Sequence, residues 1–371
     1  MTMHRDERPA RRIRHLRSVD EHRQLSDCAR ESLRDVEETY AFRANDYYLG
    51  LIDWNDPDDP IRRLVVPDPA ELTNWGRLDA SNEAANTVVP GVQHKYRDTA
   101  LVLAAPTCSA YCRYCFRKRL FMDDNDEASL DADAAVAYVA RHREVRDVLL
   151  TGGDPLVLGT DRLLDLMERF AAIEHVRVLR IGTKTLAFNP FRVLEDPRLT
   201  AGIDRTVQTG TGVYVMAHFD HPRELAPPAR EAIRALQMAG AHVVNQCPLI
   251  RGVNDDPRVL AELFTTMTVI GAPQYYLFQG RPTAGNKPYT VPLVEGWRIF
   301  DAARRRCSGL SRRARFCMSH ATGKIEIMGI DRHHIHCRYH RTADPELESR
   351  VVVCHRDDRA YWFNDLAQVG G

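Results

Sequence analysis

The chain has 371 residues, 44% of them hydrophobic, so it is long enough to bury a sizeable core in one large domain or in two. Its Lys plus Arg and its Asp plus Glu both number 51, and this balance removes the global electrostatic argument for nucleic-acid binding. The apolar runs are too short for a transmembrane helix, and the polar first residues do not match a secretory signal. Nine cysteines in such a chain favour reduced thiols in the cytoplasm over a disulfide framework.

The first part of the chain is polar and rich in charge, and we interpret residues 1–92 as an N-terminal arm and helical extension. A basic run ends at Arg17, but acidic residues and helix formers follow it at once. A solvated arm is therefore favoured over a nucleic-acid-binding one. Paired prolines then interrupt the pattern, so we expect a turn-rich helical segment that packs on the main domain.

From Leu101 onward, short apolar runs alternate with amphipathic stretches. This alternation predicts an α/β fold whose parallel strands are joined by right-handed helical crossovers. The expected strands are 101–105, 147–151, 176–181, 213–219, 242–249 and 274–278. The expected helices are 130–143, with Ser129 as its N-cap, and 229–238, 260–270 and 293–305.

The last part of the chain has apolar runs at 324–330 and 350–353, which predict a C-terminal β segment. Cys337 and Cys354 lie there among several histidines, without the regular spacing of a zinc site. We interpret these histidines as surface and strand residues, with a metal site as the alternative.

Three cysteines follow the first expected strand directly: Cys108, Cys112 and Cys115. A [4Fe–4S] cluster normally takes four thiolates, so three would leave one iron open to a small molecule. Disulfides between cysteines this close in sequence would be strained. The spacing therefore predicts cluster ligands, and the alternative is three buried cysteines gathered without a metal.

The stretch from Cys108 to Cys115 reads Cys-Ser-Ala-Tyr-Cys-Arg-Tyr-Cys, and a basic run follows it. It resembles the signature of radical S-adenosylmethionine enzymes, and more closely that of the lysine 2,3-aminomutase family. The likeness extends from about Gln93 to Gly329 and implies an open parallel (β/α)6 partial barrel. We place this core at 93–310 and the C-terminal β segment, with its candidate catalytic lysine, at 311–371. The resemblance also implies three cofactors: a [4Fe–4S] cluster, S-adenosylmethionine and pyridoxal phosphate.

The turn Gly152-Gly153-Asp154 ends the second expected strand. Glycines there permit a positive φ and the close approach of a ligand to the backbone. The turn resembles the family's Gly-Gly motif, which binds the amino group of S-adenosylmethionine. The resemblance also implies cofactor contacts for Asn245 and Gln246, which close the fifth strand, and a loop-packing or adenine-contact role for His218.

Gly323-Lys324 opens the strand expected at 324–330, where the family places the lysine that binds pyridoxal phosphate as a Schiff base. Such a lysine must be partly desolvated so that its amine is neutral. The glycine-rich run before it is shorter here than in the family. Lys95 and Tyr96 match a basic-Tyr pair that lies beside the pyridoxal phosphate. Arg180 and Lys184, at the end of the third strand, are cations suited to phosphate or carboxylate groups.

Two departures from the family pattern predict a substrate without a positive side chain. Arg117 matches the family residue that binds the substrate carboxylate, a task suited to a bidentate guanidinium. Lysine-specific members have an aspartate where this chain has Arg281, and another where it has an uncharged stretch around Ser319. Because an unpaired buried ammonium is costly, we predict an acidic or neutral side chain, with glutamate as first candidate. The alternative is that Arg281 turns outward and says nothing about the substrate.

The resemblance thus implies a radical S-adenosylmethionine, pyridoxal phosphate-dependent 2,3-aminomutase that moves an amino group of a free amino acid from C2 to C3. It implies a small-molecule substrate, an electron donor such as flavodoxin or ferredoxin, and a homo-oligomer, with no role for nucleic acid or membrane. One alternative is a radical enzyme on the same scaffold that abstracts hydrogen without pyridoxal phosphate. The other is a non-catalytic iron–sulfur protein.

Overall fold

The computed structural model describes residues 13–122, 127 and 129–370, so most of the predicted solvated arm lies outside the described residues. Within this part of the chain, twelve strands form one sheet in the order β14-β13-β12-β11-β10-β9-β8-β7-β6-β5-β4-β3. The centre of the sheet is a run of parallel strands: β5 (Thr99–Ala105), β6 (Asp147–Gly152), β7 (Val178–Thr183), β8 (Gly212–Ala217), β9 (His242–Pro248), β10 (Gln274–Phe278) and β11 (Arg315–His320). Antiparallel strands extend both edges: β3 (Thr87–Val89) and β4 (Val92–Tyr96) at one, β12 (Gly323–Ile330), β13 (His334–Thr342) and β14 (Val351–His355) at the other.

The α/β class and the open parallel architecture are confirmed, since the parallel strands do not close on themselves and antiparallel strands flank them. Each of the six expected strands is present within two residues of its expected bounds. The sequence analysis missed β11, which continues the parallel run, because arginines precede its short buried centre at Phe316, Cys317 and Met318. It also missed β13, where inward Ile335 and Cys337 alternate with partly exposed histidines.

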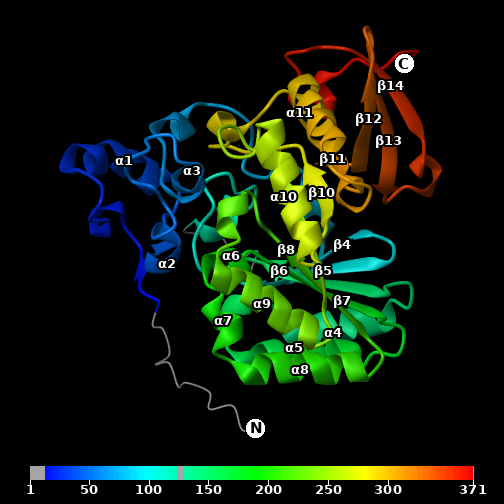
Figure 1. Ribbon diagram of the computed structural model, residues 1–371. Coiled ribbons are helices and arrows are strands. Elements are labelled where there is room, and N and C mark those ends of the chain that lie inside the picture. Colours follow the sequence, from blue (N-terminus) through cyan, green and yellow to red (C-terminus); the bar gives the residue numbers. More distant parts are fainter. Residues whose placement is uncertain (1–12, 123–126, 128, 371) are drawn as a thin grey trace.

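The crossover helices cover the outer face of the parallel strands (Figure 1). They are α4 (Ala132–Arg141), α5 (Thr160–Ala171), α6 (Thr185–Phe188), α7 (Phe191–Leu194), α8 (Pro197–Gln208), α9 (Pro227–Met238), α10 (Pro257–Val269) and α11 (Leu293–Arg305). Proline opens α8, α9 and α10, where its missing N–H costs nothing. The N-cap of α4 is Asp131, which accepts from the Ala134 amide at 2.9 Å, and not the expected Ser129.

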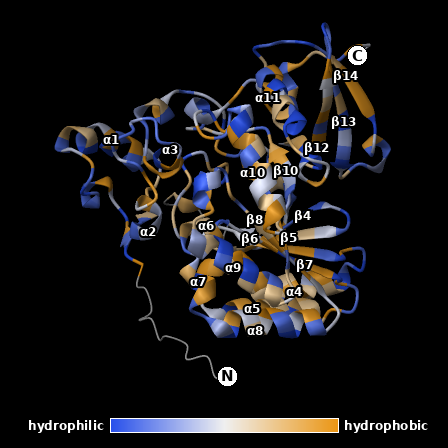
Figure 2. Ribbon diagram, viewed as in Figure 1, coloured by the Kyte–Doolittle hydropathy of each residue, from blue (hydrophilic) through white to orange (hydrophobic). Residues whose placement is uncertain are grey.

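The helices are amphipathic and the strands between them are largely apolar, as the colours of Figure 2 show. The strand residues that face the helices, such as Val148, Leu150 and Ile181, are fully buried. Burying these side chains is the main favourable term that holds the layers together. No helix in the described residues has both the length and the apolar character needed to cross a membrane.

The N-terminal extension wraps the loop that follows β5. It contains β1 (His15–Leu16), α1 (Asp27–Thr39), β2 (Ala44–Asn45), α2 (Asp46–Leu49) and α3 (Pro60–Val65). The Tyr111 amide donates to the Arg43 carbonyl at 2.8 Å, and the Arg113 amide donates to the Leu64 carbonyl at 2.9 Å. The extension (blue in Figure 1) and the C-terminal strands (orange to red) lie on opposite sides of the molecule's upper part. The extension is therefore built into the fold beside the cysteine loop.

Candidate active site

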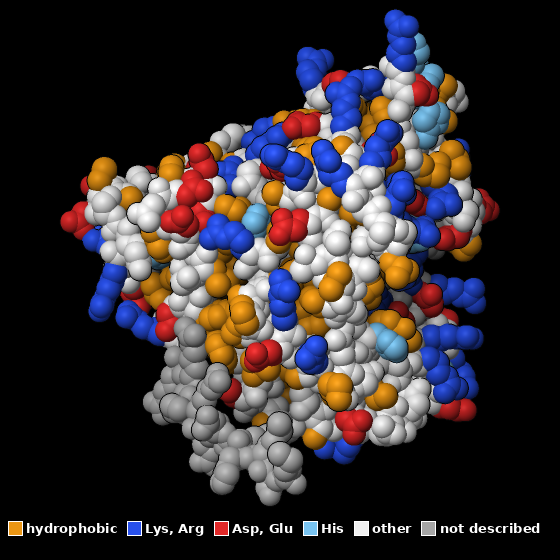
Figure 3. Space-filling model, viewed as in Figure 1, with side chains coloured by type: hydrophobic (Ala, Val, Ile, Leu, Met, Phe, Trp, Pro, Cys, Tyr) orange, Lys and Arg blue, Asp and Glu red, His pale blue; other side chains and the backbone are white. Residues whose placement is uncertain are grey.

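A cavity of roughly 350 Å³ opens at the carboxyl ends of the parallel strands. In parallel barrels this end carries the reactive groups, because loops from several strands converge there. Its lining includes the three cysteines of the loop after β5, the turn after β6 and Lys324 of β12. Basic and acidic side chains are spread together over the outer face shown in Figure 3. The charges considered for ligand binding are therefore those that line the cavity.

The cysteine loop is held by backbone hydrogen bonds, and its three thiols face the cavity. The Cys115 amide donates to the Cys112 carbonyl at 3.1 Å, and Cys108 lines the same space. Burial raises the pKa of each thiol, so each is neutral until a cation binds beside it. The described residues hold no group of three His, Cys, Asp or Glu side chains already arranged around a metal position. The ligand set therefore stays a prediction.

The Gly152-Gly153 turn packs directly on the start of the cysteine loop. Gly152 has a φ of +111°, and a Cβ on Gly153 would lie 2.1 Å from the Thr107 carbonyl oxygen. The Gly153 amide donates to the Ala105 carbonyl at 2.7 Å, and the Asp154 amide donates to the Thr107 carbonyl at 2.8 Å. These two amides are thus used within the protein. The glycines are required chiefly because two backbones meet here.

Two residues expected to contact a cofactor are already engaged by the protein. The buried Asp154 carboxylate accepts from the Thr183 hydroxyl at 2.7 Å and from the Lys184 amide at 2.8 Å. Asn245 does not line the cavity, because its side chain bonds both backbone groups of Phe219, at 2.9 and 3.0 Å. Both side chains therefore join neighbouring strand ends. Gln246 does line the cavity.

His218 faces the cavity above a buried ion network. Its Nε2 lies 3.0 Å from an Asp220 carboxylate oxygen and 3.1 Å from the Tyr114 hydroxyl. The Lys184 ammonium lies 2.6 Å from Asp220 and 2.6 Å from Glu224, and these carboxylates raise its pKa against the effect of burial.

The two cations expected to bind phosphate or carboxylate at the end of β7 are both neutralised by protein carboxylates. Lys184 belongs to the buried network, and Arg180 pairs with Asp147 at 2.7 Å. Neither guanidinium nor ammonium is left unpaired for a ligand at this position.

Lys324 projects from β12 into the cavity. Its Nζ lies 4.2 Å from the ring centre of Tyr276 and 5.4 Å from that of Phe278. No acceptor among the described residues lies within hydrogen-bond distance of this Nζ. Desolvation, together with the charges of Arg180, Arg281 and Lys95, lowers the pKa of Lys324 to about 8, against an opposing effect of Cys317. A neutral amine is thus accessible at mildly alkaline pH, as attachment to an aldehyde requires.

Lys95 and Tyr96 line the same part of the cavity. Desolvation lowers the pKa of Lys95 to about 8, but its Nζ donates to the His320 carbonyl. Burial raises the pKa of Tyr96 to about 12, so its phenol stays protonated.

Orphaned polar atoms in the lining test whether the cavity suits a bound ligand. Gln93 is 5% exposed and Asn286 is 4% exposed, yet Gln93 Nε2 and Asn286 Oδ1 have no hydrogen-bond partner among the described residues. Buried polar groups without partners are costly. Together with three inward thiols and a desolvated lysine, they fit a cavity that holds polar cofactors and substrate.

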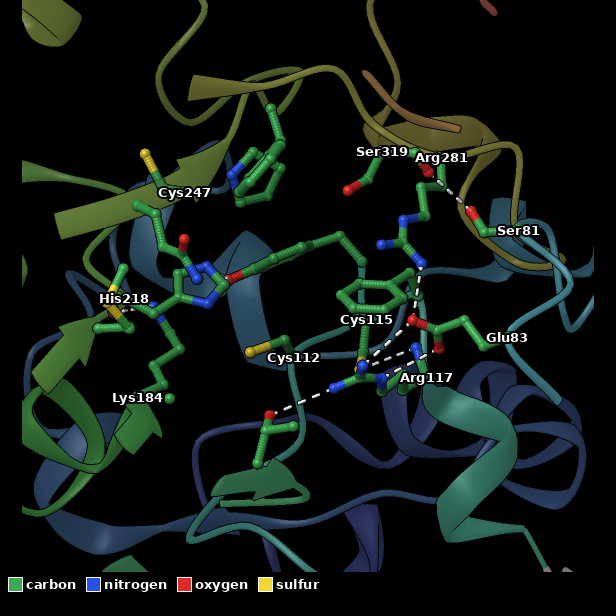
Figure 4. A pocket seen from close by; sticks show the side chains of 18 of the residues that line it. Ser81, Glu83, Cys112, Cys115, Arg117, Lys184, His218, Cys247, Arg281 and Ser319 are labelled. Atoms are coloured by element: carbon green, nitrogen blue, oxygen red, sulfur yellow. Dashed lines mark hydrogen bonds and ion pairs between the residues drawn. The ribbon is translucent and has the colours of Figure 1, made fainter. Parts of the chain in front are cut away.

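Arg117 and Arg281 both lie inside the cavity, so the alternative that Arg281 turns outward is wrong. Both bind a residue that the sequence analysis missed, Glu83 of the N-terminal extension (Figure 4). No local pattern marks Glu83.

Comparison with known proteins decides the family. Residues 102–264 match the model of the radical SAM superfamily. The chain is 48% identical over 347 residues to a protein of Aquifex aeolicus named "Putative L-lysine 2,3-aminomutase", covering 93% of each chain. The chain belongs to the lysine 2,3-aminomutase family of radical S-adenosylmethionine enzymes.

Two further members of this lysine 2,3-aminomutase family are less similar than the Aquifex protein. L-lysine 2,3-aminomutase of Clostridium subterminale is 34% identical, over 71% of this chain and 62% of its own. Glutamate 2,3-aminomutase of Clostridioides difficile is 30% identical, over 77% of this chain and 67% of its own. The relatives are thus isomerases that differ in the amino acid they are named for. Radical SAM enzymes use a [4Fe–4S] cluster and S-adenosylmethionine, and act on small molecules with the help of an electron donor.

Proposed function

We propose that this enzyme is a pyridoxal phosphate-dependent 2,3-aminomutase that moves an amino group of a free amino acid from C2 to C3, and that its substrate is not lysine. The observation that carries the proposal is the shared cavity, which Lys324 of β12 and the three thiols of the loop after β5 enter together. A desolvated lysine beside the thiols supports attachment of pyridoxal phosphate over the alternative of a radical enzyme without it.

Cys108, Cys112 and Cys115 would hold the cluster, with the turn Gly152-Gly153 and Gln246 beside S-adenosylmethionine. Lys324 would hold pyridoxal phosphate, with Lys95 and Tyr96 beside it. When bound, the cluster and S-adenosylmethionine supply a hydrogen-abstracting radical, and pyridoxal phosphate carries the migrating amino group. The chain's own residues orient these groups, and the enclosing loops keep water away from them.

The proposal for the substrate depends on the charges in the cavity. Arg281 lines the cavity, where it would repel an ammonium, whereas a carboxylate would pair with it. Glu83 is the acidic residue beside it, and it already forms ion pairs with three arginines. We therefore propose an acidic or neutral substrate side chain, with glutamate as first candidate; the relative named glutamate 2,3-aminomutase supports this choice.

We further propose that flavodoxin or ferredoxin serves as electron donor, that the enzyme is a homo-oligomer, and that residues 1–92, 93–310 and 311–371 are its structural segments. The function is tested by incubating reconstituted, reduced enzyme with S-adenosylmethionine, pyridoxal phosphate and each standard amino acid. A β-amino isomer of glutamate, lost in Lys324→Arg, is the expected product. Formation of β-lysine as the main product would overturn the substrate proposal. Cleavage of S-adenosylmethionine without any β-isomer would overturn the aminomutase itself.

A further inference from the structure

Glu83 lies between two arginines at one end of the cavity (Figure 4). Its carboxylate accepts from Arg117 Nε at 3.0 Å and Nη2 at 3.1 Å, and from Arg281 Nη1 at 3.2 Å. Glu83 is 9% exposed. The turn that carries it is fixed by Asp79, which accepts from the Glu83 amide at 2.8 Å. The extension thus contributes a side chain to the interior of the active site.

The two guanidiniums also share an aromatic ring. The Phe116 ring centre lies 3.7 Å from the Arg281 guanidinium carbon and 4.9 Å from that of Arg117. Two like charges this close in a desolvated site repel each other, and burial and Arg117 lower the pKa of Arg281 while Glu83 raises it. The charges of Arg117 and Arg281 hold the pKa of Glu83 well below its usual range, although burial alone would raise that pKa. Glu83 is therefore an anion that keeps two cations together.

The bonds to Glu83 leave part of each guanidinium facing the cavity. Glu83 occupies the Nε–Nη2 edge of Arg117, while Nη1 donates to the Thr151 hydroxyl at 3.2 Å. On Arg281 the Nη1 atom bonds Glu83. A guanidinium carries five N–H donors in a rigid fork, so each arginine keeps donors for a further carboxylate.

We propose that Glu83 is a positioning residue that aligns Arg117 and Arg281 as a pair of carboxylate-binding groups, one for the α-carboxylate and one for the side-chain carboxylate of an acidic amino acid. The choice of substrate rests on the proposed function. Preorganised donors bind more strongly, because the cost of ordering them is met before the ligand arrives. Arg119 also reaches Glu83, at 3.4 Å, but its closer partner is Glu127 at 2.9 Å.

The test compares the binding of glutamate and glutamine, which have nearly the same shape and differ by one charge. Calorimetry on the full chain, reconstituted with cluster and pyridoxal phosphate but left unreduced, measures binding without turnover. In Glu83→Gln, we expect the preference for glutamate over glutamine to fall by about tenfold or more. Glu127→Gln is the matched control, because it removes a carboxylate from the neighbouring Arg119 and should leave the preference unchanged.

Each outcome decides the proposal. Loss of the preference in Glu83→Gln, with the control unchanged, supports it. A preference that stays or grows in Glu83→Gln overturns it, since Glu83 would then be idle or would compete with the substrate. Equal binding of both ligands by the wild-type protein also overturns it. That result would not contradict the aminomutase activity, which the product assay tests separately. If Glu83→Gln does not fold, Glu83→Asp replaces it, because the shorter carboxylate cannot reach both arginines and should lose the preference as well.

Discussion

The carboxylate of Glu71 and the guanidinium of Arg113 form a fully buried, bidentate ion pair between the N-terminal extension and the cysteine loop. The Arg113 Nε lies 3.0 Å and its Nη2 2.8 Å from the Glu71 oxygens. The Tyr289 hydroxyl donates to the same carboxylate at 2.8 Å. Glu71 therefore joins three segments, and one of them carries the predicted cluster ligands.

We predict that Glu71→Gln weakens both the fold and the cluster site. Removing one partner leaves the Arg113 charge buried and unpaired, which costs about 3 kcal/mol. Chemical denaturation should show this loss, and iron content after reconstitution should fall. Glu168→Gln removes an exposed partner of Arg205 instead and should change stability by less than about 1 kcal/mol. Equal effects of the two substitutions would contradict the role given to Glu71.

Gly153→Ala should disrupt the cysteine loop through its contact with the end of β6. The added methyl would lie 2.1 Å from the Thr107 carbonyl oxygen, so the end of β6 must move away from the cysteine loop. We expect a lower Tm and less iron bound per chain. Gly159→Ala is the control, because a Cβ there meets nothing within 4 Å. Full iron binding by Gly153→Ala would show that the contact is dispensable.

Serine at Cys108, Cys112 or Cys115 should abolish the brown cluster chromophore and the reductive cleavage of S-adenosylmethionine. Serine is a poor ligand for iron in such clusters, whose usual ligand is thiolate. Cys28→Ser, at an exposed cysteine outside the cavity, should retain both properties. If one of these three serine variants kept both the chromophore and the cleavage activity, the substituted cysteine would not be a cluster ligand.

Lys324 should capture pyridoxal phosphate with a rate that rises as the pH approaches about 8. The pKa of its ammonium lies below the usual 10.5, so the amine is protonated below pH about 8 and neutral above it. Borohydride reduction followed by peptide mapping identifies the site. Lys95 has a similar pKa, but its Nζ is bonded to the His320 carbonyl. Labelling of Lys95 in place of Lys324 would exchange their roles.

The sequence predicted many of the features that local patterns encode, although the amphipathic helices α5 and α8 were not among the expected ones. Apolar runs between amphipathic stretches located six parallel strands, and the spacing of Cys108, Cys112 and Cys115 located the cysteine loop. Two features escaped because their local patterns mislead: arginines obscure β11, and alternating histidines obscure β13.

The residues that the sequence could not predict act through distant partners. Glu71 binds Arg113 across 42 positions, and Glu83 binds Arg281 across 198. A single sequence does not record such pairings, because they depend on how the extension folds back over the barrel. Asn245 was expected at a cofactor, and its side chain instead bonds Phe219, 26 positions away on the neighbouring strand end of the barrel.

The central claim is that the three thiols and Lys324 act on one amino acid in one cavity. Following the hydrogen on C3 of the substrate tests this claim most directly. Reduced, reconstituted enzyme is incubated with S-adenosylmethionine, pyridoxal phosphate and glutamate deuterated at C3, and the products are analysed by mass spectrometry. We predict deuterium in 5′-deoxyadenosine and a β-isomer whose amino group is on C3. Deuterium-free 5′-deoxyadenosine without any β-isomer, from glutamate and from the other standard amino acids labelled in the same way, would contradict it.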